Sequence, residues 1–484
     1  MGDGRRIAIV GAGPGGLCMG IRLKAAGFER FEILDKAGGV GGTWYHNRYP
    51  GCACDVPSQL YSFSFEPKTD WSRPFAPQPE ILTYLESCAV KYGLLPHCRL
   101  GDAVERVTWD EATARWTLAL ASGRTTHADV VVSAIGMFNE LVLPDIPGLD
   151  SFAGTRFHSA RWDAAHDLSG ETVGVIGSAA SAVQLVPEIV QTAARVHLFQ
   201  RTANWVGPKD DAPYTDEQLA RFRRDPDAAP ALRARIFDSL GGPQAFARVR
   251  AEREAACLAN LAQVADPAVR ERLRPTHRWG RKRPLFSNEY YPAFNRPNLE
   301  LVTERIARVK PDGVVTDDGR ERRLDTLILA TGFATTRFLS AIDVVGRGGR
   351  TIGDAWRDGA HAYKGVTTAG FPNLFMLYGP NTNSDSIITL IEYQADHVLR
   401  QIERLVRDDL AWIDVRPEHE AAYNADLQRD IAAIDAWQGG CTDYYHGPDG
   451  RIVTQWPRSM RALQEALAAL DEDAYESAPR ATRG

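Results

Sequence analysis

The sequence predicts an α/β protein built from two dinucleotide-binding (Rossmann-like) domains, with a helical insertion in the second. Three observations favour this fold class. A buried strand that runs into a glycine-rich turn and then a helix occurs twice, over residues 6–26 and 171–192. Each of these units is followed by a hairpin that ends in Ala-x-Gly. The stretch 208–278 is rich in Ala, Arg, Glu and Asp and lacks the alternation of strands, which favours inserted helices.

The first unit begins with the apolar run Arg6–Val10, typical of a buried parallel strand, and continues into a turn with Gly11, Gly13 and Gly16. The first glycine permits the turn, the second lets a pyrophosphate approach the backbone, and the third lets the helix pack on the strand. A second strand ends in Asp35, which is placed to bind ribose hydroxyls. The unit predicts a site for NAD or FAD.

The second unit is a variant of the first. Alanine replaces the second and third glycines, and the turn residues expected to contact a cofactor are Gly177, Ser178, Ala179 and Ser181. The next strand ends in Gln200, and Arg201 and Thr202 follow it. An acid at this place would repel a 2′-phosphate, whereas a guanidinium and a hydroxyl bind it. We therefore predict NADPH rather than NADH.

The remaining elements follow from periodicity. Over residues 103–136 and 305–332, alternating strands lead through a Gly-Arg turn to a buried strand, so we interpret the chain as two copies of one module. A buried strand within 371–383 breaks into a turn, and a helix runs from about Ser386 to Arg407. Residues 459–471 are expected to form an amphipathic helix, and the final dozen or so residues a loose tail.

Composition restricts the class of function. The 484 residues are 44% hydrophobic and 24% charged, which is ordinary for two or three soluble domains. The formal charge of -6 does not suit a nucleic-acid binder, and no apolar run approaches the roughly 18 residues of a membrane span. The seven cysteines are scattered without metal-ligand spacing, which indicates reduced cytoplasmic thiols and no metal site. A small-molecule substrate is the remaining expectation.

The segment that joins the two units has a distinctive spacing of aromatic and small residues. These residues are Phe152, Gly154, His158, Trp162 and Asp163. A linker between two dinucleotide folds lies where two cofactors could meet, so a histidine and a tryptophan held there can control their approach.

This spacing resembles the F-x-G-x-x-x-H-x-x-x-W-[P/D] fingerprint of type I Baeyer–Villiger monooxygenases, a group of class B flavoprotein monooxygenases that use FAD and NADPH. The segments 38–44, 49–65, 371–383 and 440–457 are also similar to this family, so the resemblance covers nearly the whole chain. Asp35 departs from it, because Glu is commoner there, and Tyr444 stands where Trp is frequent.

The resemblance implies further site residues. Around FAD it implies contacts from Gly42, Thr43, Trp44, Asp55, Tyr61, Val104, Asn383 and Ile387. For NADP it implies Lys282, which would bind a phosphate, and Tyr444, in a loop that would close over the cofactor. Arg283 is implied as the catalytic arginine beside the flavin, and Asp55 as the carboxylate that orients it.

The resemblance also implies which half binds which cofactor. Residues 1–145 and 370–484 are expected to form an FAD-binding domain. Residues 146–369 are expected to form an NADPH-binding domain that includes the helical insertion at about 208–278, with 152–163 as the inter-domain linker.

The implied reaction inserts one oxygen atom of O2 next to the carbonyl of a ketone. NADPH reduces FAD, O2 adds at the flavin C4a, and the deprotonated peroxide attacks a small-molecule ketone to give an ester or lactone. A permanently charged guanidinium suits an anionic peroxide held in a water-poor site, which is why Arg283 is expected to be catalytic.

Three other functions stay open at this point. Cys52 and Cys54 could serve a flavin disulfide or small-molecule reductase, although C-x-C is not the usual spacing of such a redox pair. A protonated peroxide would instead oxidise sulfur or nitrogen atoms. A redox-sensing protein that only binds the cofactors would show no substrate-stimulated NADPH consumption.

Overall fold

Each glycine-rich unit belongs to a five-stranded parallel sheet in the computed structural model, which describes residues 4–438, 445–447 and 449–480. The first sheet has the order β19-β7-β1-β2-β3, and α1 (Pro14–Ala25) follows β1 directly. Its strands are β1 (Ile7–Val10), β2 (Phe31–Asp35), β3 (Cys98–Leu100), β7 (Val130–Ser133) and β19 (Leu374–Met376). Every residue of β1 and β7 is buried, as expected for strands covered on both faces.

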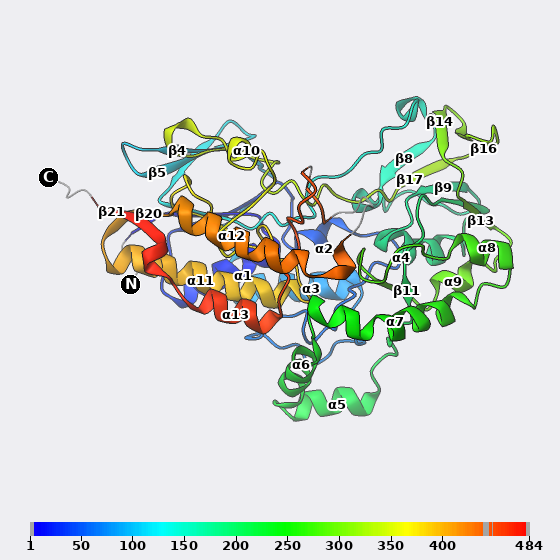
Figure 1. Ribbon diagram of the computed structural model, residues 1–484, viewed down its shortest axis with the longest axis horizontal. Coiled ribbons are helices and arrows are strands. Elements are labelled where there is room, and N and C mark those ends of the chain that lie inside the picture. Colours follow the sequence, from blue (N-terminus) through cyan, green and yellow to red (C-terminus); the bar gives the residue numbers. More distant parts are fainter. Residues whose placement is uncertain (1–3, 439–444, 448, 481–484) are drawn as a thin grey trace.

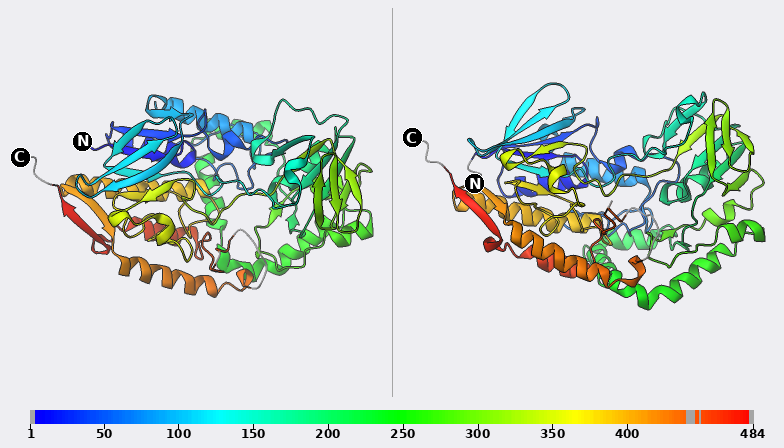
Figure 2. Two further views of the ribbon diagram at one scale, coloured as in Figure 1. Left: turned by 90° about the horizontal axis from the view of Figure 1, so that it is seen from above. Right: turned by 45° about the horizontal axis from the view of Figure 1, so that its top comes forward.

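The second sheet repeats this design with the order β13-β10-β9-β17-β8, and α4 (Ala180–Ile189) follows β9. Its strands are β8 (Thr155–His158), β9 (Thr172–Ile176), β10 (Arg195–Phe199), β13 (Leu299–Val302) and β17 (Thr326–Leu329). The two sheets lie toward opposite ends of the long axis (Figures 1 and 2). The predicted fold class is confirmed.

The predicted duplication is confirmed in the hairpins. Before β7 the chain forms β4 (Val104–Asp110), β5 (Arg115–Leu120) and β6 (Thr125–Ala128), and before β17 it forms β14 (Ile306–Lys310), β15 (Gly313–Thr316) and β16 (Glu321–Arg323). Within each set the neighbouring strands are antiparallel.

The chain returns to the first half earlier than the expected boundary at residue 370. The strand β18 (Asp343–Val345) pairs in parallel with β4, so the chain has already crossed back by residue 343. A three-residue strand whose partner lies more than two hundred residues away leaves no local pattern in the sequence. The assignment of the two halves to FAD and NADPH stays a prediction at this point.

The insertion is helical, as expected, and it packs on the first half of the chain. It contains α5 (Asp216–Arg224), α6 (Ala228–Ser239), α7 (Phe246–Leu261) and α8 (Pro267–Arg272), between the paired strands β11 (Val206–Gly207) and β12 (Leu285–Phe286). Arg233 of α6 donates hydrogen bonds to the carbonyl oxygens of Gln59, Leu60 and Ser62 at 2.9, 3.1 and 2.7 Å. Those residues belong to the first half.

The C-terminal elements correct one expectation. The long helix α11 (Ile387–Arg407) and the amphipathic helix α13 (Met460–Ala468) form as predicted, with α12 (Pro417–Ala432) between them. The expected loose tail is wrong, because β21 (Tyr475–Pro479) pairs antiparallel with β20 (Leu410–Val415) and buries Tyr475. The remaining helices are α2 (Thr43–His46), α3 (Gln78–Lys91), α9 (Tyr290–Ala293) and α10 (Ile352–Ala355).

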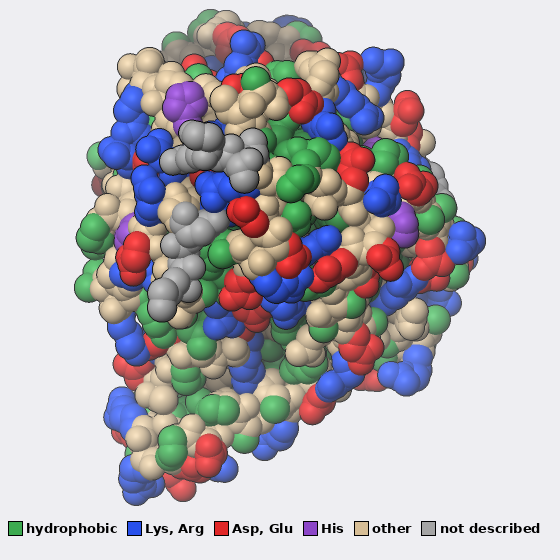
Figure 3. Space-filling view, turned by 90° about the vertical axis from the view of Figure 1, so that its left-hand side faces the viewer, with side chains coloured by type: hydrophobic (Ala, Val, Ile, Leu, Met, Phe, Trp, Pro, Cys, Tyr) green, Lys and Arg blue, Asp and Glu red, His purple; other side chains and the backbone are tan. Residues whose placement is uncertain are grey.

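On the face shown in Figure 3, basic and acidic side chains are interspersed. Among the residues that the structure describes, no helix has the length and apolar character needed to cross a bilayer. The same residues contain no group of three or more His, Cys, Asp or Glu side chains that could hold a metal ion.

Asp414 of β20 predicts a pH dependence of stability. Both carboxylate oxygens accept from the Gly370 amide at 3.1 Å, and burial raises the pKa of Asp414 to about 7. The pKa of an unfolded Asp is about 3.9. Between this pKa and the native pKa of about 7, Asp414 is protonated in the native state and ionised in the unfolded state, so the stability of the native state falls as the pH rises toward 7. The slope from this group is at most about 1.4 kcal/mol per pH unit.

We therefore expect Asp414→Asn to gain stability relative to wild type as the pH rises. Thermal unfolding midpoints measured at about pH 5 and about pH 8 test this, because the difference between variant and wild type should be more favourable at the higher pH. An equal difference at both pH values would show that the Asp414 carboxyl ionises normally.

Candidate active site between the two glycine-rich turns

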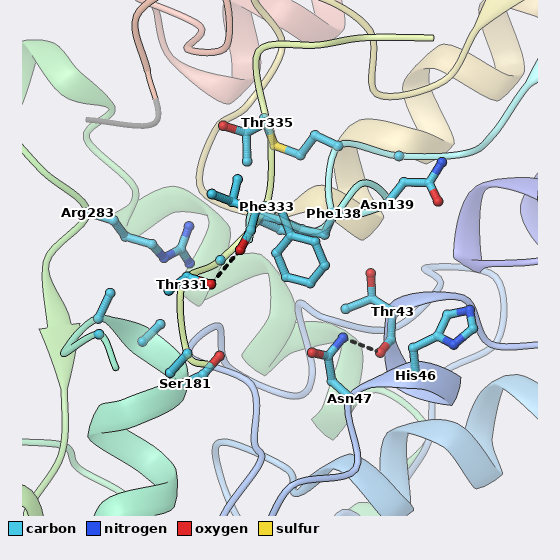
Figure 4. Close-up of a pocket in the computed structure, with 18 of the residues that line it drawn as sticks. Thr43, His46, Asn47, Phe138, Asn139, Ser181, Arg283, Thr331, Phe333 and Thr335 are labelled. Atoms are coloured by element: carbon cyan, nitrogen blue, oxygen red, sulfur yellow. Dashed lines mark hydrogen bonds between the residues drawn. The ribbon is translucent and has the colours of Figure 1, made fainter. Parts of the chain in front are cut away.

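A cavity of about 1190 Å³ is lined by both glycine-rich turns. Most of the expected site residues line it (Figure 4). From the first half these are Gly11, Gly13, Asp35, Gly42, Thr43, Trp44, Asp55, Tyr61, Val104 and Ile387. From the second half they are Gly177, Ser178, Ala179, Ser181, Arg201, Thr202, Lys282 and Arg283.

Some expected residues lie elsewhere. Gly16 is outside the lining, and a Cβ there would lie 1.8 Å from the Gly11 carbonyl oxygen, so this glycine serves the packing of α1 on β1. The Asn383 amide is turned to other side chains, because its Oδ1 accepts from the Tyr378 hydroxyl at 2.6 Å and its Nδ2 donates to Gln455. The structure therefore does not support Asn383 as a side chain of the cavity. Tyr444 lies outside the described residues.

The two turns make the same backbone contact with the two Ala-x-Gly segments. Gly11 and Gly177 have φ of +113° and +108°, and a Cβ on them would lie 2.5 Å from the Ala134 carbonyl oxygen and 2.4 Å from that of Ala330. Each turn is thus packed against the end of the module's last strand, where only glycine fits. The duplication seen in the sequence extends to this contact.

Asp35 is held at the end of β2 by backbone donors. Its Oδ2 accepts from the Ala12 amide at 2.6 Å and its Oδ1 from the Ala37 amide at 2.8 Å. An ionised carboxylate oxygen accepts more than one hydrogen bond, so each oxygen can still accept from a ribose hydroxyl. The first bond also ties Asp35 to the glycine-rich turn.

The second half presents basic and hydroxyl groups where a 2′-phosphate is expected. Arg201 is exposed and lines the cavity with Thr202, whose carbonyl oxygen accepts from the Ser178 hydroxyl at 3.3 Å. The end of β13 adds Thr303, Glu304 and Arg305 to the same lining. The sequence motifs did not reveal these three residues, because they follow a strand that carries no fingerprint.

Arg283 and Asp55 form a bidentate ion pair. The Arg283 Nε donates to Asp55 Oδ2 at 2.8 Å, and Nη2 donates to Oδ1 at 2.7 Å. The side chains are 32% and 28% exposed, so the pair borders the cavity. Figure 4 shows Arg283 extending into the cavity from the second half. The two residues are 228 positions apart, and their contact agrees with the orientation that the resemblance implied.

The sequence motifs did not identify two polar residues that line the cavity. Ser384 and Asp385 precede α11, and burial raises the pKa of Asp385, while the Arg283 charge opposes that rise. Phe138, Asn139, Thr331 and Phe333 also line the cavity at the points where the chain crosses between the halves (Figure 4). Phe138 and Asn139 lie in a loop that carries no motif, whereas Thr331 lies within the second Ala-x-Gly segment and Phe333 follows it.

The linker forms an edge strand and not a free hinge. Gly154 lies against β17, and a Cβ there would be 2.2 Å from the Asp325 carbonyl oxygen. His158 is buried at the end of β8, where its Nδ1 accepts from the Ala160 amide at 3.1 Å and burial lowers its pKa to about 4. Its ring lies edge-on to Phe333 with centroids 6.0 Å apart. His158 therefore contacts two residues of the cavity lining, Phe333 and Gly332.

The other linker residues stabilise the same edge. The ring of Phe152 packs in the core of the second half, and Trp162 packs edge-on against Phe157 with centroids 5.0 Å apart. Asp163 accepts from the Ala165 amide at 3.0 Å. None of these side chains lines the cavity.

The thiols near the cavity do not suit a redox pair. Cys52 and Cys54 are free and buried, and burial raises the pKa of Cys52 to about 12 and that of Cys54 further. A thiolate is the reactive form, so both residues are poor nucleophiles. These two thiols therefore do not favour the reductase alternative.

Comparison with known proteins agrees with this geometry. Residues 8–227 match the family model described as pyridine nucleotide-disulphide oxidoreductase. The chain is 40% identical over 480 residues to a Baeyer-Villiger monooxygenase of Streptomyces coelicolor, covering 97% of this chain and 92% of that protein. An oxidized steroid monooxygenase bound to NADP superposes with a TM-score of 0.89 at 31% identity, covering 98% of this chain and 100% of the other. OTEMO in complex with FAD and NADP superposes with a TM-score of 0.88 at 27% identity, covering 98% and 99%.

Proposed function

The chain belongs to the Baeyer–Villiger monooxygenase family, and from this premise we propose how its own residues carry out the reaction. It is an FAD- and NADPH-dependent monooxygenase that inserts one atom of O2 next to the carbonyl of a small-molecule ketone. The observation that carries the proposal is the Asp55–Arg283 ion pair at a cavity lined by both glycine-rich turns.

The residues present fit both cofactors. The first turn and the two free acceptor positions of Asp35 suit the pyrophosphate and ribose of FAD. The second turn with Arg201 and Thr202 suits the pyrophosphate and 2′-phosphate of NADPH, and Lys282 adds a further cation for phosphate. When bound, these groups supply a hydride donor and a flavin that reacts with O2.

The Arg283 guanidinium is the group we assign to the reacting oxygen atoms. It keeps its charge at any working pH, and it can stabilise negative charge that develops on oxygen during attack on the ketone. Asp55 binds two of its nitrogen atoms and so fixes the plane of the guanidinium. We assign Asp55 the task of orienting Arg283, which lowers the reorganisation needed at the moment of reaction.

Product analysis tests the proposed function. Enzyme loaded with FAD is reduced with NADPH in the absence of oxygen and then mixed with oxygen and each member of a panel of cyclic and linear ketones. We expect an ester or lactone in an amount equal to the NADPH consumed. A matched panel of sulfides and amines serves as the comparison. Sulfoxides or N-oxides alone, or only hydrogen peroxide while a ketone stimulates NADPH consumption, would contradict the proposal.

A further inference from the structure

The loop that carries Asp55 is held by its own backbone and by a contact from outside it. Residues 47–77, between α2 and α3, contain no helix or strand, yet they include Asp55 and Tyr61, which both line the cavity. Backbone hydrogen bonds between the two ends of the loop hold it in part, from the Cys54 amide to the Ala76 carbonyl oxygen at 3.0 Å and from the Gln78 amide to the Cys52 carbonyl oxygen at 2.8 Å. A further contact near Asp55 comes from the other half of the chain.

Gln184 of α4 pairs with this loop as a neighbouring strand would. Its Nε2 donates to the Ala53 carbonyl oxygen at 2.9 Å, and its Oε1 accepts from the Ala53 amide at 3.4 Å. The same oxygen accepts from the Tyr49 hydroxyl at 2.9 Å. One side-chain amide therefore bonds both backbone groups of a residue that lies two positions before Asp55.

The backbones are also in direct contact at this point. Gly51 has φ of +77°, and a Cβ there would lie 2.6 Å from the carbonyl oxygen of Gln184 and 3.0 Å from the Glu188 Cγ. A side chain at residue 51 would push the loop away from α4. The close approach lets the Gln184 amide reach the Ala53 backbone.

Gln184 lies on the helix that begins at the second glycine-rich turn. Ser181 and Gln184 are three positions apart, so they lie on neighbouring positions of one face of α4, and both line the cavity. The Tyr49 hydroxyl is also close enough to Ser181 to form a side-chain hydrogen bond. The contact thus joins the helix of the NADPH side to the loop that holds Asp55 and, through it, Arg283.

We propose that Gln184 is a positioning residue that fixes the Asp55 loop against α4 and thereby sets the placement of the nicotinamide relative to the flavin and Arg283. The inference rests on the proposed function, because it assigns NADPH to the turn at the start of α4. Hydride transfer depends steeply on the placement of donor and acceptor, whereas binding of the phosphates depends on Arg201, Thr202 and the turn itself. Loss of Gln184 should therefore affect the rate more than the affinity.

The test is Gln184→Met, which keeps the length of the side chain and removes its hydrogen bonds. We expect flavin reduction at saturating NADPH to be about tenfold slower, while the Kd of NADP+ changes by less than about twofold. The control is Gln191→Met, whose side chain donates only to the Pro187 carbonyl oxygen at the end of the same helix and is expected to leave both values unchanged. Reduction at the wild-type rate in Gln184→Met would overturn the proposal.

A second variant distinguishes a positioning role of Gln184 from a general loss of stability. Tyr49→Phe removes one donor to Gln184 and should slow reduction in the same direction by a smaller factor. Thermal unfolding of the single and double variants measures the coupling between the two residues, and the loss of stability in the double variant should be smaller than the sum of the two single losses. A rate of flavin reduction per folded enzyme equal to wild type would show that Gln184 is merely structural.

Failure of this inference can be told apart from failure of the proposed function. Flavin reduction precedes the oxygen step, so it can be measured in the absence of oxygen and of any ketone. If the wild-type enzyme forms no ester from any ketone, the proposed function is refuted. If the flavin of Gln184→Met is nevertheless reduced more slowly than that of wild type, the positioning role is supported.

Discussion

Replacing Arg283 by alanine is expected to abolish ester formation, with kcat for the ester lowered by at least about 10³-fold. The reason is that Arg283 is the cation we assign to negative charge on the reacting oxygen atoms, and its partner Asp55 would be left without a counter-charge. Flavin reduction by NADPH should change by less than about tenfold, because hydride transfer does not need this charge. Ester yield and anaerobic reduction rate, measured on the same preparation, check both expectations.

Two variants make this result specific. Arg283→Lys keeps the charge but cannot bind Asp55 with two parallel hydrogen bonds, so we expect part of the ester-forming activity to be retained. Arg235→Ala removes an exposed arginine of α6 in the helical insertion and should leave ester formation unchanged. An Arg283→Ala enzyme that still makes ester at a rate near that of wild type would refute the assignment.

Replacing Arg201 by alanine is expected to lower kcat/KM for NADPH by about 100-fold and to leave the value for NADH nearly unchanged. Arg201 lines the cavity beside Thr202, directly after β10, at the end of a strand where an acid would repel a 2′-phosphate. The variant loses a charged hydrogen bond to the 2′-phosphate, which NADPH has and NADH lacks. Steady-state kinetics with both coenzymes measure the preference.

The matched control for this variant lies on the same strand. Arg195 begins β10 at the opposite end, where it pairs with Glu300 at 3.4 Å. Arg195→Ala should leave the coenzyme preference unchanged. If Arg201→Ala also preserves the preference for NADPH, or if wild type shows none, another part of the cavity selects the coenzyme.

The parts of the fold that the sequence predicted are those with a local signal. The two glycine-rich turns, their flanking strands and the paired hairpins were read correctly, because hydrophobic runs and glycines at fixed spacing depend on neighbours in the chain. The pairing of β18 with β4 and of β21 with β20 was missed. Both are short edge strands whose partners lie far away, and such pairing depends on tertiary contacts.

The candidate site also contains residues that the sequence predicted and residues that it did not. Residues inside family motifs, such as Asp35, Asp55 and Arg201, line the cavity as expected. The sequence did not identify Gln184 or Asp385 as site residues. Gln184 is a glutamine within a helix and Asp385 is an acid just before a helix, and their roles depend on contacts with the other half of the chain. The motif placed Asn383 at FAD, and the structure shows its side-chain amide bonded to Tyr378 and Gln455, so this contact stays a prediction.

Isotopic labelling of the product tests the central claim most directly. Enzyme with FAD and NADPH is supplied with a ketone that it converts, under isotopically heavy O2 in ordinary water, and the ester is analysed by mass spectrometry. We expect one heavy oxygen atom per ester, in the bridging position, and none in Arg283→Ala because no ester forms. An ester oxygen that comes from water, or a heavy ester formed equally well without Arg283, would contradict this account.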